Sequence, residues 1–213
     1  MTNNKTVNEV TNIIEKFPNL SVIINEGNWI VLEGILDITA QDSFQVKIEY
    51  DTTNGQFPKL FELGNKIPKK LTRHIYTQDN SCCITVPEMQ AILLNQGLTL
   101  LDFIEKHAIP YFANQLYYEE NGVYANGEYS HGSKGIIEFY QDILKTKDKI
   151  LILKIIKHIF DGNLPSTKQN CLCKKGKKFR DCHQKAVLLL SNISKQKLFI
   201  DYKQIENYEF RKL

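Results

Sequence analysis

Residues 29–50, WIVLEGILDITAQDSFQVKIEY, decide the fold class of this chain. Trp29 to Ile38 and Phe44 to Tyr50 are rich in β-branched and aromatic residues, as strands are, and the turn-like residues Thr39 to Asp42 separate them. Leu20 to Ile24 is a third run of the same kind. Together the three runs predict an antiparallel meander.

Working outward from the meander, helices are expected on both sides of it. Val7 to Phe17 places apolar residues at helical spacing and ends at Pro18. Leu60 to Leu63 is a candidate fourth strand, and the unpatterned residues 64–81 predict a long loop. Thr85-Val86-Pro87-Glu88 fits a capping box that starts a helix ending near Leu94. Further helices are expected at Leu98 to Ile104, Tyr111 to Tyr118, Gly135 to Leu144 and Lys149 to Phe160.

The overall composition is that of an ordinary globular protein. With 213 residues, of which 42% are hydrophobic and 24% charged, the chain can bury one substantial core and a small accessory module. A formal net charge of +3 is too small to mark a nucleic-acid-binding protein, and no aromatic residues alternate with the basic ones as in single-strand binders. Nucleic acid is therefore an unlikely partner.

No targeting segment is evident in the sequence. The N-terminal residues lack the apolar stretch of a secretory signal, and the longest apolar run, Ile150 to Phe160, is interrupted by Lys154 and Lys157. Five cysteines, an odd number, argue against a secreted disulfide framework. We expect a soluble protein of the cytoplasm with no membrane contact.

Three of the cysteines form a metal-type pattern near the C-terminus. Cys171, Cys173, Cys182 and His183 follow the order Cys-x-Cys, eight residues, Cys-His. Three thiolates and one imidazole complete a tetrahedral zinc site, and no position is left open for substrate, so the zinc is expected to be structural. The alternative is three incidental cysteines on a basic loop.

This pattern resembles the SEC-C zinc motif, and the resemblance covers about residues 168–186. The intervening Lys-Lys-Gly-Lys-Lys-Phe at 174–179 agrees with the motif's glycine, lysine and aromatic positions. The surrounding basic residues, called the basic cluster below, are expected either to dock on an acidic surface or phosphate, or simply to be a solvated face. They are Lys168, Lys174, Lys175, Lys177, Lys178, Arg180 and Lys185.

The other two cysteines, Cys82 and Cys83, stand just ahead of the expected helix at residue 85. A cysteine thiolate attacks carbonyl carbons readily, and the thioester that it forms stays reactive toward amines. A helix N-terminus nearby would favour the thiolate. The alternative is that both cysteines are small apolar residues packed beneath the helix.

The order of these features resembles the ubiquitin-conjugating (UBC) family over roughly residues 5–145. His74 to Cys83 is similar to the family's His-Pro-Asn and Cys-Leu stretch, with Cys83-Ile84 at the nucleophile position. Residues 97–103, 112–120 and 126–132 look like the divergent bacterial branch, some members of which accompany cGAS-like nucleotidyltransferases in antiphage (CBASS) operons.

The resemblance implies that Cys83 carries a protein's C-terminal carboxylate as a thioester and transfers it to an amine, with His74 beside it. Cys82 remains the alternative nucleophile. The implied cargo is a protein with a transferable C-terminus, a cGAS-like nucleotidyltransferase among the candidates. His74-Ile75-Tyr76 lacks the family's asparagine, so the oxyanion-stabilising role is vacant or filled by Asn80, His74 or backbone N–H groups.

The sequence therefore predicts an α+β fold: a UBC-like domain at 1–145 with an N-terminal helix, a four-stranded antiparallel meander and C-terminal helices, a connecting helix and linker at 146–165, and a SEC-C-like zinc module with a C-terminal tail at 166–213. No phosphate loop or Gly-x-Gly-x-x-Gly motif is present, so an activating partner must supply the energised acyl group. The competing prediction is an inactive UBC-like scaffold that docks partners through its basic cluster. A cysteine hydrolase is weaker, because no orienting acid can be assigned.

Overall fold

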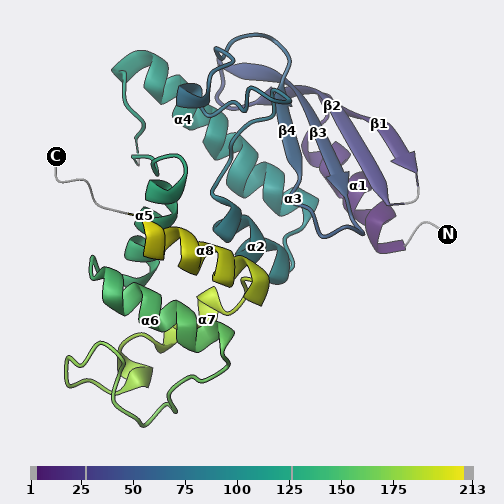
Figure 1. Cartoon of the computed structure of the whole chain (residues 1–213). Coiled ribbons are helices and arrows are strands. Elements are labelled where there is room, and N and C mark those ends of the chain that lie inside the picture. Colours follow the sequence, from purple (N-terminus) through teal and green to yellow (C-terminus); the bar gives the residue numbers. More distant parts are fainter. Residues whose placement is uncertain (1–3, 27, 126, 209–213) are drawn as a thin grey trace. The chain divides into compact units, whose positions relative to one another are not determined.

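The computed structural model of the chain describes residues 4–26, 28–125 and 127–208 (Figure 1). The chain forms two compact units, and each is described by itself. The first combines Met1–Thr85 with Gly97–Gly127, and the second combines Val86–Gln96 with Glu128–Leu213.

The first unit contains a four-stranded antiparallel sheet in the order β1-β2-β3-β4 (Figure 1). Its strands are β1 (Leu20–Glu26), β2 (Trp29–Asp37), β3 (Ser43–Asp51) and β4 (Lys59–Glu62). Each strand pairs with the next along the chain, so the sheet is the meander that the sequence predicts. The class is α+β, as expected.

The core of the first unit lies against one face of this sheet. Leu32, Leu36 and Phe44 alternate with more exposed residues along β2 and β3, because successive side chains of a strand point to opposite faces. Helix α1 (Asn4–Lys16) contributes Ile13 to the same core. The ring of Phe112 stacks on that of Phe44 with centroids 4.3 Å apart.

Phe112 lies on a long helical stretch that the sequence predicts as two separate helices. The stretch consists of α3 (Leu100–Phe103), a π-helical turn, η2 (Ile104–Ala108), and α4 (Ile109–Asn121). In the π-helical turn, the N–H of Ile109 donates to the carbonyl of Ile104, and Pro110 follows immediately. Because Pro110 has no N–H for an α-helical bond, the change of hydrogen-bond pattern at this point keeps the helix continuous.

The second unit is helical. It contains α2 (Pro87–Asn95), α5 (Ser133–Leu144), α6 (Lys149–Phe160), α7 (Gln184–Leu190) and α8 (Lys195–Asn207). All five contribute buried apolar residues to one cluster that includes Ile92, Phe139, Ile155, Leu190 and Leu198. The carboxylate of Asp148 caps α6 by accepting from the N–H groups of Ile150 and Leu151. None of the described helices is long and apolar enough to cross a membrane.

Two features of the second unit differ from the expectations. Helix α2 begins after Val86, so the predicted capping residue, Thr85, lies one position before the N-cap. Glu88 is instead fully buried and paired with Lys197 of α8. Because α2 packs with α5 to α8, the division into compact units differs from the predicted ranges 1–145, 146–165 and 166–213.

Candidate metal centre and thiol site

A tight turn in the second unit brings together the residues predicted as metal ligands. The N–H of Cys171 donates to the carbonyl of Lys177 at 2.9 Å, and Asn170 pairs with Lys178 as an isolated antiparallel bridge. Gly176 makes the reversal with φ of 75°, a left-handed conformation that suits glycine. Cys171 and Cys173 therefore lie on one arm of a small hairpin.

The other two ligands follow directly in the chain. Cys182 comes after the 3-10 turn η3 (Phe179–Asp181), and His183 immediately precedes α7. Phe179 is buried in the helical core, so the turn before Cys182 is anchored rather than free. The apolar packing thus positions the second pair of ligands against the first.

The four ligand atoms lie within 4.8 Å of one another. Nδ1 of His183 is 3.1 Å from Sγ of Cys171 and 3.2 Å from Sγ of Cys182, and the sulfurs of Cys173 and Cys182 are 3.5 Å apart. A tetrahedral zinc site places such atoms about 3.5 to 3.8 Å from each other. The donor set and its spacing therefore fit a metal ion, and all four residues predicted as ligands lie in one cluster.

The chemistry around the cluster also suits a cation. Nε2 of His183 lies 3.1 Å from the carbonyl oxygen of Leu144, so a proton on Nε2 leaves Nδ1 with its lone pair directed at the sulfurs. Burial and the neighbouring Cys173 and Cys171 raise the pKa of Cys182 to about 12. Sulfurs this close cannot all ionise unless a positive charge compensates them.

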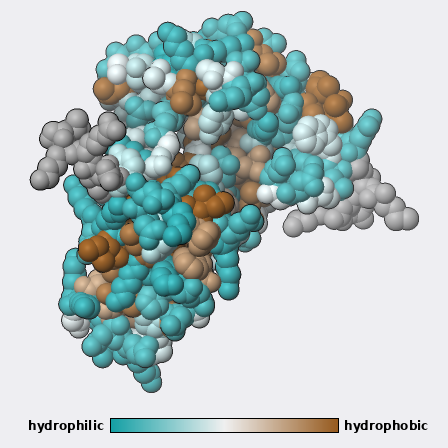
Figure 2. All heavy atoms as spheres, viewed as in Figure 1, coloured by the Kyte–Doolittle hydropathy of each residue, from teal (hydrophilic) through white to brown (hydrophobic). Residues whose placement is uncertain are grey.

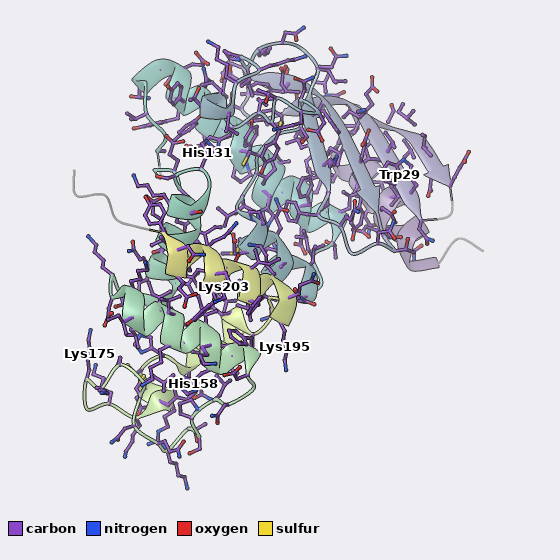
Figure 3. The ribbon with its side chains drawn as sticks, in the orientation of Figure 1. Trp29, His131, His158, Lys175, Lys195 and Lys203 are labelled. Atoms are coloured by element: carbon purple, nitrogen blue, oxygen red, sulfur yellow. The ribbon has the colours of Figure 1, made fainter. Side chains whose placement is uncertain are left out.

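The basic cluster flanks the candidate metal ligands in the sequence, and its residues are exposed. Lys174, Lys175 and Lys177 are exposed, and the structure gives none of their side chains an ion pair within the residues that it describes. Figure 2 shows a largely hydrophilic surface over this loop, and Figure 3 shows Lys175 at its edge. The predicted positive surface is therefore present next to the metal cluster.

The candidate thiol site lies in the first unit, where the chain after β4 returns to the sheet. The loop contains the 3-10 turn η1 (Leu71–Arg73), and Ile75 then pairs with Cys82 as an isolated antiparallel bridge. The N–H of Cys82 donates to the carbonyl of Leu60 at 2.7 Å, and the N–H of Cys83 donates to the carbonyl of His74 at 2.7 Å. The two cysteines are therefore held in extended backbone.

Extended backbone sends the two thiols to opposite sides. The side chain of Cys82 is 6% exposed and belongs to the core of the first unit, whereas Cys83 is only half-buried. Burial raises the pKa of Cys82 to about 12 and also raises the pKa of Cys83.

Tyr76 is a residue of this site that the sequence did not single out. Burial raises the pKa of the Cys83 thiol, and the Tyr76 hydroxyl acts in the opposite direction. Since Ile75 faces Cys82 across the bridge, Tyr76 and Cys83 are diagonal neighbours on one face of the strand pair. That alternation is the signal that could have placed Tyr76 and Cys83 on the same face.

His74 supports the site through its backbone. Its carbonyl accepts from the N–H of Cys83 and, at 3.0 Å, from the hydroxyl of Tyr111. Its imidazole packs edge-on against the ring of Tyr124, with centroids 4.9 Å apart. The neighbouring Arg73 is buried among Gln115, Glu119 and Tyr118.

The turn between Tyr76 and Ser81 is closed by local bonds. The carboxylate of Asp79 accepts from the N–H and the hydroxyl of Ser81 and pairs with Lys59 at 2.8 Å, which lowers the pKa of Asp79 to about 2. Asn80 is exposed and left-handed, with φ of 60°, and its N–H donates to the carbonyl of Tyr76. The backbone of Asn80 thus closes the turn.

No family model, no curated protein and no solved structure matches the chain. The chain's own geometry offers two distinct kinds of chemistry: a closed cluster of three thiols and one imidazole that fits a metal ion, and the half-buried thiol of Cys83.

Proposed function

We propose that the first unit is a UBC-like acyl carrier in which Cys83 holds a protein's C-terminus as a thioester and transfers it to an amine. The observation that supports this most is the separation of the two cysteines. Cys82 is enclosed in the core, while Cys83 is only half-buried. The order of one helix, a four-stranded meander, a long loop and the cysteine agrees with the resemblance.

The proposed chemistry has two steps. In loading, Cys83 loses its proton to water, the thiolate attacks the activated acyl carbon, a carbon–sulfur bond forms, and the donor's leaving group departs with its electron pair. In transfer, an amine nitrogen attacks the thioester carbon, a carbon–nitrogen bond forms, and Cys83 leaves as a thiolate while the amine releases a proton to water.

The proposal requires partners. An activating partner must supply the energised acyl group, because the sequence carries no phosphate-binding loop. The proposed cargo is a protein with a transferable C-terminus, in the first instance a cGAS-like nucleotidyltransferase of a bacterial antiphage (CBASS) system. The proposed setting is the cytoplasm, where thiols such as Cys83 stay reduced.

A chemical donor tests the proposal without its natural partners. A fluorescent peptide ending in glycine, supplied as a mercaptoethanesulfonate thioester, should label the protein with a band that dithiothreitol or hydroxylamine removes. Added free lysine should discharge the band to peptidyl-lysine. Cys83→Ala should abolish labelling and Cys82→Ala should retain it; labelling that survives in Cys83→Ala and disappears in Cys82→Ala would move the nucleophile, and none in the wild type would reject the proposal.

The second unit, we further propose, binds one structural zinc ion through Cys171, Cys173, Cys182 and His183. The cluster is closed by four protein ligands, and the helical core packs against Cys171 and Phe179. Elemental analysis should find one zinc per chain, lost in Cys171→Ser and retained in Cys83→Ala. A protein purified in zinc-containing buffer that holds no stoichiometric metal would reject this site.

A second candidate function is a catalytically inactive UBC-like scaffold that docks protein partners through the basic cluster. The observation that favours it is the set of exposed lysines beside the metal cluster, Lys174, Lys175 and Lys177. Under this proposal, changing these three to Glu abolishes partner capture and Cys83→Ala has no effect. Under the acyl-carrier proposal, Cys83→Ala abolishes peptide labelling, and the three changes to Glu leave labelling intact.

A further inference from the structure

The three thiols of the candidate metal cluster differ in exposure. The sulfurs of Cys173 and Cys182 lie 3.5 Å apart, and both residues are only half-buried. Cys171 is 3% exposed, and its sulfur lies 3.1 Å from Nδ1 of His183. The cluster therefore contains one pair of neighbouring thiols on partly exposed residues, and a third thiol that is enclosed.

The surroundings of the pair give a small molecule access to it. The segment between α6 and α7 runs as irregular loops at one end of the helical unit (Figure 1). Cys182 also lines a pocket of about 610 Å³, whose other walls include Ile143 and Lys185. An oxidant that enters this pocket reaches Cys182 before it reaches the enclosed Cys171, because reaction at a thiol depends on access to it.

We propose that a peroxide oxidises Cys173 and Cys182 to a disulfide, which releases the metal ion and makes this cluster a redox-sensitive switch of the second unit. The part of this inference that concerns the metal rests on the proposed zinc site. The pairing of the two thiols does not, because it follows from their own distance and exposure.

The reaction balances in two steps. The sulfur of Cys182 attacks one oxygen of the peroxide, the oxygen–oxygen bond breaks, and a sulfenic acid forms with loss of hydroxide. The sulfur of Cys173 then attacks the oxidised sulfur, a sulfur–sulfur bond forms, and a second hydroxide leaves. The two thiolates lose two electrons, the peroxide gains them, and two protons from solvent convert both hydroxides into water.

The local backbone keeps the pair together when the metal leaves. The N–H of Cys171 donates to the carbonyl of Lys177 at 2.9 Å, and the N–H of Phe179 donates to the carbonyl of Gln169 at 2.8 Å. Phe179 is also buried in the helical core. From their distance of 3.5 Å, the two sulfurs need to approach by only about 1.5 Å to reach the length of a disulfide bond.

The two adjacent cysteines of the first unit do not compete as a pair. Cys82 is enclosed in the core, and the extended backbone sends the thiols of Cys82 and Cys83 to opposite sides. A disulfide needs the two side chains to point toward each other. The neighbouring thiols of Cys173 and Cys182 meet this requirement better than the adjacent pair does.

Oxidation removes two of the four donors at once. Cys171 and His183 remain, and two protein donors do not close a tetrahedral zinc site. His183 immediately precedes α7, and its Nε2 lies 3.1 Å from the carbonyl oxygen of Leu144. Release of the metal therefore loosens the connection between α7 and the end of α5. A dithiol reductant followed by zinc restores the cluster, because it returns the two electrons and both thiolates.

The test uses full-length protein loaded with zinc and treated with hydrogen peroxide. The dye 4-(2-pyridylazo)resorcinol measures released zinc, and non-reducing tryptic mapping after iodoacetamide locates the disulfide. Cys171 and Cys173 share the tryptic peptide at 169–174, so fragment ions must show which of them carries the iodoacetamide label. One zinc should be released per disulfide, with the label on Cys171, and dithiothreitol with added zinc should reverse the change.

Cys171→Ser and Cys182→Ser are a matched pair, since each removes one thiol of the cluster and with it the metal. Peroxide should still join Cys173 to Cys182 in Cys171→Ser. The intramolecular disulfide yield in Cys182→Ser should be at least about tenfold lower, because its remaining thiols include the enclosed Cys171. Circular dichroism compares the folding of the two variants, and the mapping of the wild type decides if either is unfolded.

The outcomes separate this inference from the zinc site on which part of it rests. Zinc that stays bound while peroxide oxidises the protein overturns the switch, and a wild-type disulfide made mainly by Cys171 overturns the pairing. Protein that never holds zinc rejects the proposed metal site. In that protein a disulfide between Cys173 and Cys182 still supports the pairing, and its absence overturns the inference as well.

Discussion

Nε2 of His183 lies 3.1 Å from the carbonyl oxygen of Leu144, the last residue of α5. This contact links the candidate metal cluster to the helical core, because Leu144 is buried in the same apolar cluster as Phe179. A bond from Nε2 also fixes the tautomer in which Nδ1 is free to bind a cation. The ligands are thus oriented by packing as well as by their own turn.

Removing the metal should therefore destabilise the second unit as a whole. Structural zinc sites supply on the order of 10 kcal/mol to the domains that they close, so a chelator should lower the thermal midpoint of this unit by more than about 10 °C. Differential scanning calorimetry with 1,10-phenanthroline, followed by re-addition of zinc, measures the change. A midpoint that does not respond to the chelator, in protein shown to have lost its metal, would contradict a structural role.

A second prediction concerns the buried ion network of α2, α5 and α8. Glu88 and Asp201 are both 0% exposed and both pair with Lys197, while the hydroxyl of Tyr140 donates to Asp201 at 2.8 Å. Burial, with the nearby charge of Glu88, raises the pKa of Asp201 to about 6, although Lys197 and Tyr140 act in the opposite direction.

The sign of the resulting pH dependence follows from linkage. An acid whose pKa is higher in the folded state binds its proton more tightly there, so its contribution to stability is present below about pH 4 and is lost as the pH rises to about 6. The wild type should lose on the order of 3 kcal/mol from this group across that range. Asp201→Asn keeps the acceptor for Tyr140 and should remove the slope.

Urea unfolding at pH 4, 5, 6 and 7 measures this difference. The exposed Asp161→Asn serves as the control and should follow the wild type at every pH. Metal release at low pH affects all three proteins alike, so the comparison between variants isolates Asp201. Parallel curves for wild type and Asp201→Asn would show that Asp201 does not titrate in this window.

The sheet and the cluster of candidate metal ligands could be predicted from the sequence because their signals are local. The β-branched and aromatic residues of Trp29–Asp37 and Ser43–Asp51 lie within each strand, and the turns between strands are short. The ligand set likewise spans only the residues from Cys171 to His183. In each case the residues that form the feature lie close together in the sequence.

The features that were missed depend on partners distant in sequence. Glu88 matches a capping box, but burial against Lys197, 109 positions away, overrides that local pattern. Helices α7 and α8 lie in the range predicted as a zinc module with a C-terminal tail, where no helix was predicted, and their Val187, Leu190, Leu198 and Ile205 are buried. The pairing of Ile75 with Cys82, which places Tyr76 and Cys83 on one face, is likewise not specified by the loop sequence.

The two adjacent cysteines should differ strongly in reactivity. Cys82 is enclosed in the core with a pKa raised to about 12, while Cys83 is only half-buried. In native protein at pH 8, iodoacetamide should modify Cys83 at least about ten times faster than Cys82, since the thiolate is the reacting form. In urea the two rates should become similar; equal rates without urea would place both thiols at the surface.

Replacing Gly34 by alanine should destabilise the first unit, because strand β2 passes very close to the chain before β1. A Cβ atom at Gly34 would lie 2.1 Å from the carbonyl oxygen of Asn19, and φ at Gly34 is +152°. The same oxygen accepts from the N–H of Ile35 at 2.9 Å, so it cannot move away without breaking that bond. Gly34→Ala should therefore cost about 2 to 4 kcal/mol in free energy of unfolding by urea titration.

Gly55→Ala separates the steric part of this cost from the backbone part. Gly55 also has a positive φ, +57°, but an added Cβ there meets nothing within 4 Å. Its replacement should cost only about 1 kcal/mol, the strain of a left-handed residue. If Gly34→Ala lowered the free energy of unfolding no more than Gly55→Ala does, β2 would not approach Asn19 this closely. The register that pairs β1 with β2 would then also be contradicted.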